Sequence, residues 1–160
     1  MNGGILPLAL IAATVGLLLS IVGRRDAWLG LAAMAGSALL VSFISFGPVA
    51  AKWVFAGLFL STIVTAALVY APRHWPRRWV LPIAVNAGGW AGALASLSGM
   101  QRALWLVLPL CLLFVPGRWF EQRGFGIAVK VAASWMIAIA SLSLFVSMMP
   151  HPGYIPDHME

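Results

Sequence analysis

Apolar residues in this chain form long continuous runs that are separated by short polar stretches. Continuous runs of about 18–20 apolar residues are typical of helices that cross a bilayer, whereas the strands of a membrane barrel alternate in polarity. The pattern predicts an all-α integral membrane protein, a compact six-transmembrane-helix bundle that forms one domain over residues 1–149. The six segments are residues 5–22, 27–46, 49–70, 80–97, 103–115 and 127–149, followed by a short polar C-terminal tail at 150–160.

The fifth segment, residues 103–115, is the shortest of the six and contains Pro109. It reaches spanning length only if it continues through Trp119 and Phe120, with the long Arg118 side chain extending to the headgroups. The alternative is a re-entrant segment, which leaves five spans. The sequence leaves both arrangements open.

The composition agrees with lipid as the main solvent. Hydrophobic residues make up 62% of the chain and charged residues 9%, with a mean hydropathy of +0.96, against roughly 25% charged residues in soluble domains. The net charge of +6 would suit nucleic acid in a soluble protein, but most of the basic residues here lie in loops between apolar runs. We therefore expect a lipid bilayer as a partner, and no nucleic acid.

The basic loops predict the orientation of the chain, because cytoplasmic loops of membrane proteins are rich in Lys and Arg. The loops of one side carry Arg24, Arg25, Arg73, Arg77, Arg78, Arg118 and Arg123. The loops of the other side carry Arg102. This bias predicts a multi-pass protein of the bacterial inner (cytoplasmic) membrane with both termini in the periplasm.

Residues 5–70 and 80–149 resemble each other as a possible internal repeat. "ILPLAL" matches "VLPIAV", "RDAWLGL" matches "RALWLVL", and "PVAAKWV" matches "GIAVKVA", in the same order along the chain. Apolar sequences also align by chance, so the rarer residues carry the comparison: Pro7 with Pro82, Arg25 with Arg102, Trp28 with Trp105, and Lys52 with Lys130. Two units of three spans each would be inverted relative to one another, which is an arrangement typical of transporters.

Lys52 and Lys130 lie about one turn inside the expected ends of the third and sixth segments. One interpretation is that each ammonium group extends to the headgroups and anchors its helix. The other is that the two lysines act as cationic gates or attract anions at the two faces of the membrane. Lys52 lies on the periplasmic side, where the enrichment of Lys and Arg in cytoplasmic loops disfavours a lysine. It is therefore the stronger candidate for a gate or an anion-attracting residue.

The fourth segment contains "AVNAGGWAGALAS", in which Asn86 is an amide deep within a span. An amide in hydrocarbon needs hydrogen-bonding partners, and small residues such as Gly88 and Gly92 let helix backbones approach closely. These residues predict either a helix-packing face or a weakened helix whose carbonyl groups line a solute path. Both alternatives put the fourth segment at the centre of the bundle.

The polar tail carries candidate metal ligands, His151, Asp157 and His158, but their spacing fits no standard site, and a solvated tail is the alternative. The acidic residues Asp26, Glu121, Asp157 and Glu160 lie in loops or in the tail. The chain contains no motif of a hydrolase, metalloprotease or nucleotide-binding protein. We therefore expect neither an enzyme nor a cofactor.

These features predict a small polytopic inner-membrane transporter or channel-like permease for a small solute or ion, acting as an oligomer. The residues expected to form the path or gate are Lys52, Lys130, Asn86, Gly88 and Gly92. The alternative is a non-catalytic accessory integral subunit of a larger membrane complex. A weaker alternative is a metal-handling membrane protein that uses the C-terminal tail. The expected partners are further copies of the chain or other membrane subunits.

Overall fold

The computed structural model of the chain describes residues 5–70, 79–99, 104 and 108–149. Within these residues all regular secondary structure is helical, with no strand, which confirms the all-α class of the prediction. The α-helices are α1 (Ile5–Ser20), α2 (Arg24–Ser42), α3 (Ala51–Leu68), α4 (Val80–Leu97), α6 (Phe114–Gln122) and α7 (Gly126–Met148). The 3-10 helices are η1 (Pro48–Ala50) and η3 (Leu108–Leu113).

Three of these helices are long and apolar enough to cross a membrane, judged by length and composition: α3, α4 and α7. Helix α1 is as apolar but has 16 residues, a length of about 24 Å at 1.5 Å per residue. Among the described residues, three candidate spans support a membrane protein, while the predicted bundle of six spans is not confirmed.

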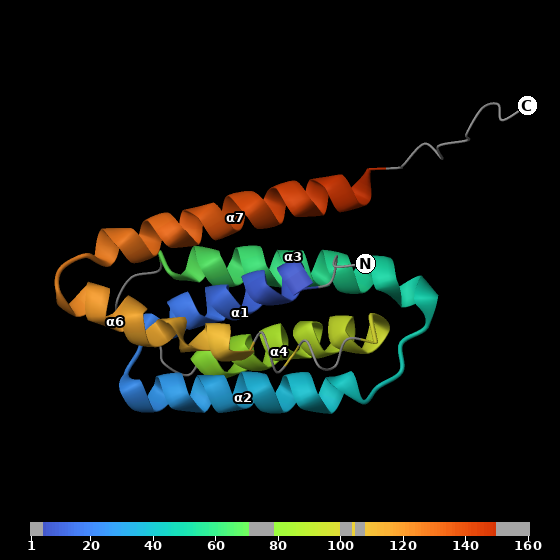
Figure 1. The fold of residues 1–160 in the computed structure, drawn as a ribbon, viewed down its shortest axis with the longest axis horizontal. Helices are drawn as coiled ribbons and strands as arrows, with labels where there is room; N and C mark the ends of the chain where they lie inside the picture. Colours follow the sequence, from blue (N-terminus) through green and yellow to red (C-terminus); the bar gives the residue numbers. More distant parts are fainter. Residues whose placement is uncertain (1–4, 71–78, 100–103, 105–107, 150–160) are drawn as a thin grey trace, which may run out of the picture.

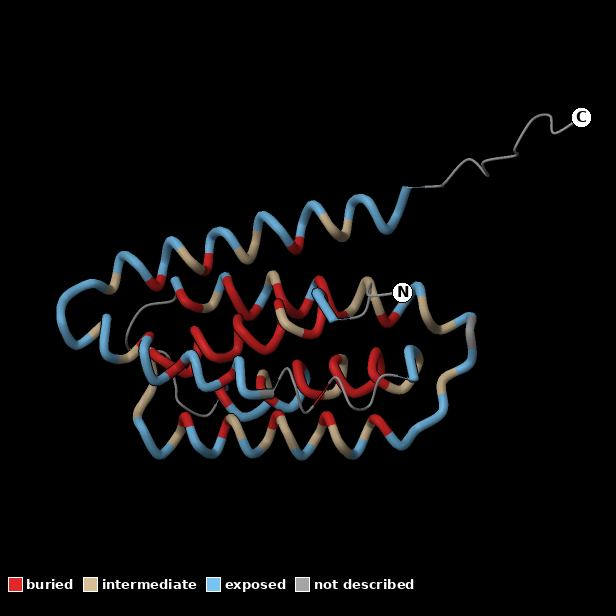
Figure 2. The backbone as a smooth tube through the Cα atoms, viewed as in Figure 1, coloured by how far each residue is buried: buried red, intermediate tan, exposed pale blue. Residues whose placement is uncertain are grey.

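Helix α1 lies at the centre of the bundle, with α4 and then α2 along one side and α3 and then α7 along the other (Figure 1). Thirteen of the 16 residues of α1 are buried, whereas α4 buries nine of its 18; Figure 2 shows the corresponding red core. Helix α4 contacts α1, α2 and α3, so residues 80–97 lie within the bundle as expected, while α1 is the more fully enclosed helix. Helix α1 carries no charged residue and is apolar on every side, so it can be enclosed by neighbours all round.

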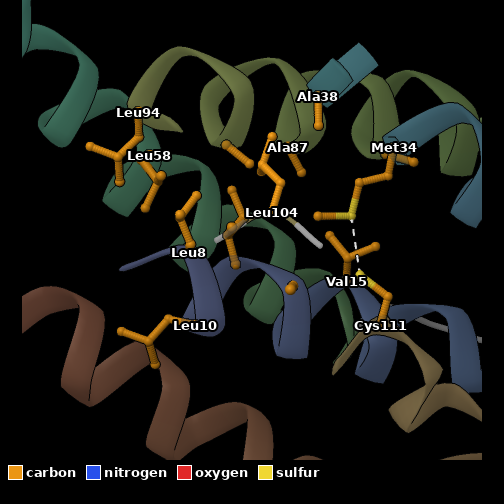
Figure 3. Packing of buried hydrophobic residues seen from close by; sticks show 14 of the residues in the cluster. Leu8, Leu10, Val15, Met34, Ala38, Leu58, Ala87, Leu94, Leu104 and Cys111 are labelled. Carbon is orange, nitrogen blue, oxygen red and sulfur yellow. Dashed lines mark hydrogen bonds between the residues drawn. The ribbon is translucent and has the colours of Figure 1, made fainter. Parts of the chain in front are cut away.

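The core is built around α1 from side chains of several helices. Figure 3 shows Leu8 of α1 close to Leu58 of α3, and Val15 of α1 close to Met34 of α2. The Cys111 thiol donates a hydrogen bond to the Met34 sulfur at 3.5 Å, which joins η3 to α2 beside α1. Sulfur-containing side chains are soft and adaptable, so they fill an irregular junction between helices well.

The predicted fifth segment differs from a single continuous α-helix. From residue 108 on, it is the 3-10 helix η3, which contains Pro109, followed by α6 to Gln122. Proline lacks a backbone N–H group and cannot donate within a regular helix, which accounts for the interruption at η3. Gly16 of α1 faces this segment, and a Cβ atom at Gly16 would lie 2.9 Å from the carbonyl oxygen of Cys111.

The predicted 3+3 repeat is not confirmed by these positions. Pro7 is buried in α1, whereas its proposed equivalent Pro82 is exposed on α4. The proposed counterpart of α2 is the interrupted segment of η3 and α6. Arg102 and Trp105, two further residues of the comparison, lie outside the described residues.

Candidate functional site

Gly88 and Gly92 lie where α4 crosses α2. A Cβ atom on Gly88 would overlap the carbonyl oxygen of Met34 and the hydroxyl of Ser37, and one on Gly92 would overlap the carbonyl oxygen of Ala38. Both glycines are buried. The structure thus uses them for the close approach of two helix backbones, which is the packing alternative of the sequence interpretation.

Asn86 lies on the outer side of α4, and its side chain is exposed. Its Nδ2 donates a hydrogen bond to the Ser61 hydroxyl of α3 at 2.9 Å, and Ser61 is buried near the middle of that helix. A carboxamide offers two N–H donors and a carbonyl acceptor, and this bond engages one donor. The exposed side chain therefore offers a second N–H donor and a carbonyl acceptor near the middle of two candidate spans.

The surroundings of this amide form what we call the lateral face. On α4, Pro82 and Gly89 lie one turn to either side of Asn86, and on α3 Val64 lies one turn beyond Ser61. Val64 and Pro82 are exposed, and a Cβ atom on Gly89 would meet nothing within 4 Å. The lateral face is therefore open and otherwise apolar, and it consists of Ser61, Val64, Pro82, Asn86 and Gly89.

Lys52 and Lys130 are both exposed and lie at opposite ends of the α3–α7 pair. Lys52 is the second residue of α3. Tyr70 follows the other end of α3, and its hydroxyl donates a hydrogen bond to the carbonyl oxygen of Lys130 at 2.6 Å. The 18 residues of α3 separate the two ends by about 27 Å. In the structure the two lysines therefore do not lie next to each other, and neither lies next to Asn86.

At one end of the bundle α1 ends, α2 begins and α6 meets α7. We call this end of the bundle the basic end, and it contains a polar pocket. The pocket volume is about 260 Å³. The Nη1 atom of Arg118 donates a hydrogen bond to the carbonyl oxygen of Val22 at 2.8 Å and so joins α6 to the α1–α2 turn. The lining residues are Ser20, Ile21, Val22, Gly23, Arg118, Glu121 and Gln122.

Sequence reasoning missed this pocket because its two walls are far apart in the chain. Arg118 is half-buried at the end of the bundle, and its extension to the headgroups stays a prediction. Its contact with Val22, however, depends on how α6 packs on α1. The amphipathic pattern of residues 114–122 is the one local signal, with Phe114 and Gly117 buried and Trp119 and Phe120 exposed.

The weak metal candidates, His151, Asp157 and His158, lie outside the described residues. Within the part of the chain that the structure describes, no group of three or more His, Cys, Asp or Glu residues is placed to hold a metal ion. Cys111, the one cysteine of the sequence, is buried against Met34.

No known protein family, no curated protein and no solved structure matches this chain.

Proposed function

We propose that this chain is a small polytopic inner-membrane permease for a small solute or ion that works as an oligomer. Its solute path lies between copies of the chain, along the lateral face, rather than through the bundle. The support for this placement is that the buried helix α1 and its core neighbours occupy the centre of the bundle.

The observation that carries the proposal is the exposed Asn86 carboxamide, bonded to Ser61 at the mid-height of α3 and α4. A polar group at this depth is costly when it faces lipid, and in membrane proteins such groups face the bundle interior or a water-filled cavity. A second copy placed against the lateral face would shield Asn86 from lipid, and the amide would then line the path between the copies.

In this proposal the two lysines act at the mouths of the path. Lys52 and Lys130 stand at opposite ends of the α3–α7 pair, where they would attract an anionic solute on each side of the membrane. Lys52→Gln removes this charge, whereas Lys52→Arg keeps it. Unchanged flux of every solute in Lys52→Gln vesicles would leave Lys52 as an interfacial anchor.

The alternative, a non-catalytic accessory subunit of a larger membrane complex, is favoured by the same amide. Asn86 could hydrogen-bond a polar group on a helix of a different subunit, and the lateral face would then be the docking surface. The two functions differ in what covers this face, so they are separated by the composition of the purified complex.

The experiment is to purify the protein in mild detergent from its native membrane and to measure the mass and composition of the complex. A homo-oligomer that dissociates in Asn86→Leu, but not in the neighbouring variant Val85→Leu, supports the permease. Stopped-flow light scattering of proteoliposomes with glycerol, urea, potassium formate and potassium phosphate then measures solute flux. Other subunits in fixed ratio support the accessory role, and a monomer with no flux contradicts the permease.

We also propose the predicted topology, with both chain ends in the periplasm and an inverted pair of three-span units. Two observations support the placement of both chain ends on one side: α1 begins and α7 ends at the same end of the bundle (Figure 1), and Arg24, Arg25, Arg118 and Arg123 belong to the opposite, basic end. Reporter fusions at both ends and after residue 78 test it. Chain ends on opposite sides of the membrane would contradict this topology.

A further inference from the structure

We infer that the pocket at the basic end binds a phosphate group. This phosphate belongs to an anionic phospholipid of the membrane leaflet in which the basic end lies. The pocket volume of about 260 Å³ equals the liquid volume of about eight or nine water molecules. This is room for a phosphate and part of the attached glycerol. The inference is independent of the proposed function, because it concerns binding at one end of the bundle.

Arg118 is the residue expected to recognise the phosphate. Its guanidinium group has five N–H donors in a planar fork that matches phosphate oxygens. The bond from Nη1 to the Val22 carbonyl oxygen fixes the side chain in the pocket wall. Because the side chain is already ordered, less conformational entropy is lost when the phosphate binds.

The charges near the pocket favour an anion. Arg24 and Arg25 directly follow the wall residue Gly23, and Arg123 directly follows the wall residue Gln122. Glu121 is an acidic residue of the wall and opposes an anion there. The balance is basic, and removing the Glu121 charge should therefore strengthen the site.

The aromatic side chains around the basic end indicate that the pocket lies at headgroup depth. Trp28 and Trp119 are exposed there, and indole side chains favour the membrane–water interface. The Arg123 guanidinium lies over the Trp119 ring, 4.1 Å from its centroid, as expected of a cation at the same level. Exposed Val115 and Phe120 on α6 offer an apolar surface for acyl chains beside the pocket, which favours a lipid over free phosphate.

The test measures binding to the purified protein in a neutral maltoside detergent. Phosphatidylglycerol, phosphatidylcholine and inorganic phosphate are titrated separately, with thermal stabilisation and lipid retention in native mass spectrometry as readouts. We expect phosphatidylglycerol to bind about tenfold more tightly than phosphatidylcholine, because the choline cation cancels the phosphate charge and is repelled by the arginines around the pocket. Saturable stabilisation by inorganic phosphate alone would support the phosphate site and assign free phosphate as its ligand.

Two variants of the pocket make the test specific. Arg118→Gln should lose about tenfold in affinity for phosphatidylglycerol, and Arg118→Lys should lose less, since it keeps the charge but not the fork. Glu121→Gln leaves Arg118 in place and should bind the lipid more tightly than the wild type. Ala138→Leu, on the exposed side of α7 and outside the pocket wall, is the control and should bind as the wild type does. Equal binding of the two lipids, or unchanged binding in both Arg118→Gln and Glu121→Gln, would overturn the inference.

Discussion

Helices α4 and α7 are both long and apolar enough to cross a membrane, yet they are packed very differently. Half of the most apolar stretch of α4 is buried inside the bundle, at 50%, against 11% for α7. Helix α4 approaches α2 through Gly88 and Gly92, where no side chain separates the two backbones. Helix α7 touches the bundle through a narrow seam, with Val129, Ala133 and Ala140 as its buried residues.

Apolarity and close packing against neighbouring helices are two separate properties of a membrane helix, and a hydropathy profile does not distinguish them. Apolarity decides that a segment prefers lipid, and it is similar for both helices. Small residues decide how closely a helix approaches a neighbour, because in lipid the driving force for association is packing rather than burial from water. On α7 the large residues Trp135, Leu142 and Phe145 are exposed.

The largest effect is expected from adding a methyl group where α4 crosses α2. In Gly92→Ala the new Cβ atom meets the backbone of Ala38, which cannot move aside as a flexible side chain would. We expect a loss of about 2 kcal/mol in the free energy of unfolding, within the usual range for overpacked cores. Unfolding in mixed micelles of dodecyl sulfate and maltoside measures it.

Gly89→Ala is the matched control, because the same change on the same helix meets nothing within 4 Å. Alanine is the better helix former by up to about 1 kcal/mol, so Gly89→Ala should be neutral or slightly stabilising. Equal destabilisation by both variants would mean that the α2–α4 contact does not depend on close backbone approach.

A smaller effect is expected in the seam of α7. Ala133→Leu adds three carbon atoms at a fully buried position, but most of α7 is not buried, so the helix can move outward. We expect a loss of about 1 kcal/mol in the free energy of unfolding, at the low end of the range for overpacking. Ala138→Leu, on the exposed side of the same helix, should change the free energy by less than about 0.5 kcal/mol. A loss for Ala133→Leu as large as that for Gly92→Ala would remove the distinction between the two helices.

The sequence was sufficient to predict the helices themselves. Segments 49–70, 80–97 and 127–149 correspond to α3, α4 and α7 within a few residues at each end. Their apolar runs are long, and they are bounded by polar, proline- or glycine-containing stretches, which are local signals. The interruption within residues 103–115 also has a local cause in Pro109. The same proline makes both a full span and a re-entrant segment compatible with the sequence.

The arrangement of the helices could not be predicted in the same way. The absence of charged residues allows α1 to be enclosed, but α4 lacks charged residues too, so this local pattern does not single out α1 as the most enclosed helix. The polar contacts join distant parts of the chain: Asn86 bonds Ser61, and Arg118 bonds Val22 from 96 positions away. Such pairs depend on which helices become neighbours, which is decided by packing over the whole bundle.

The polar contact between α3 and α4 should contribute less than either packing contact. Asn86→Ala and Ser61→Ala, with the double variant, isolate the energy of the hydrogen bond in a double-mutant cycle. We expect a coupling of about 0.6 kcal/mol, since hydrogen bonds between membrane helices are modest. The cycle is measured by the same unfolding assay. A coupling near zero would indicate that the bond does not hold α3 and α4 together. The role of Asn86 would then be limited to contacts that the lateral face makes with another chain.

The smallest effect is expected where α7 begins. Tyr70→Phe removes the hydroxyl that donates to the Lys130 carbonyl oxygen and leaves the ring in place. Because Tyr70 is exposed, we expect a loss of only about 0.5 kcal/mol, too small to separate from noise in a global unfolding curve. Hydrogen exchange of the first turns of α7 is the sensitive measurement, and it should become faster while exchange in α4 stays unchanged. The loosely packed helix α7 would then depend on single contacts at its ends, whereas α4 is held along the length of its contact with α2.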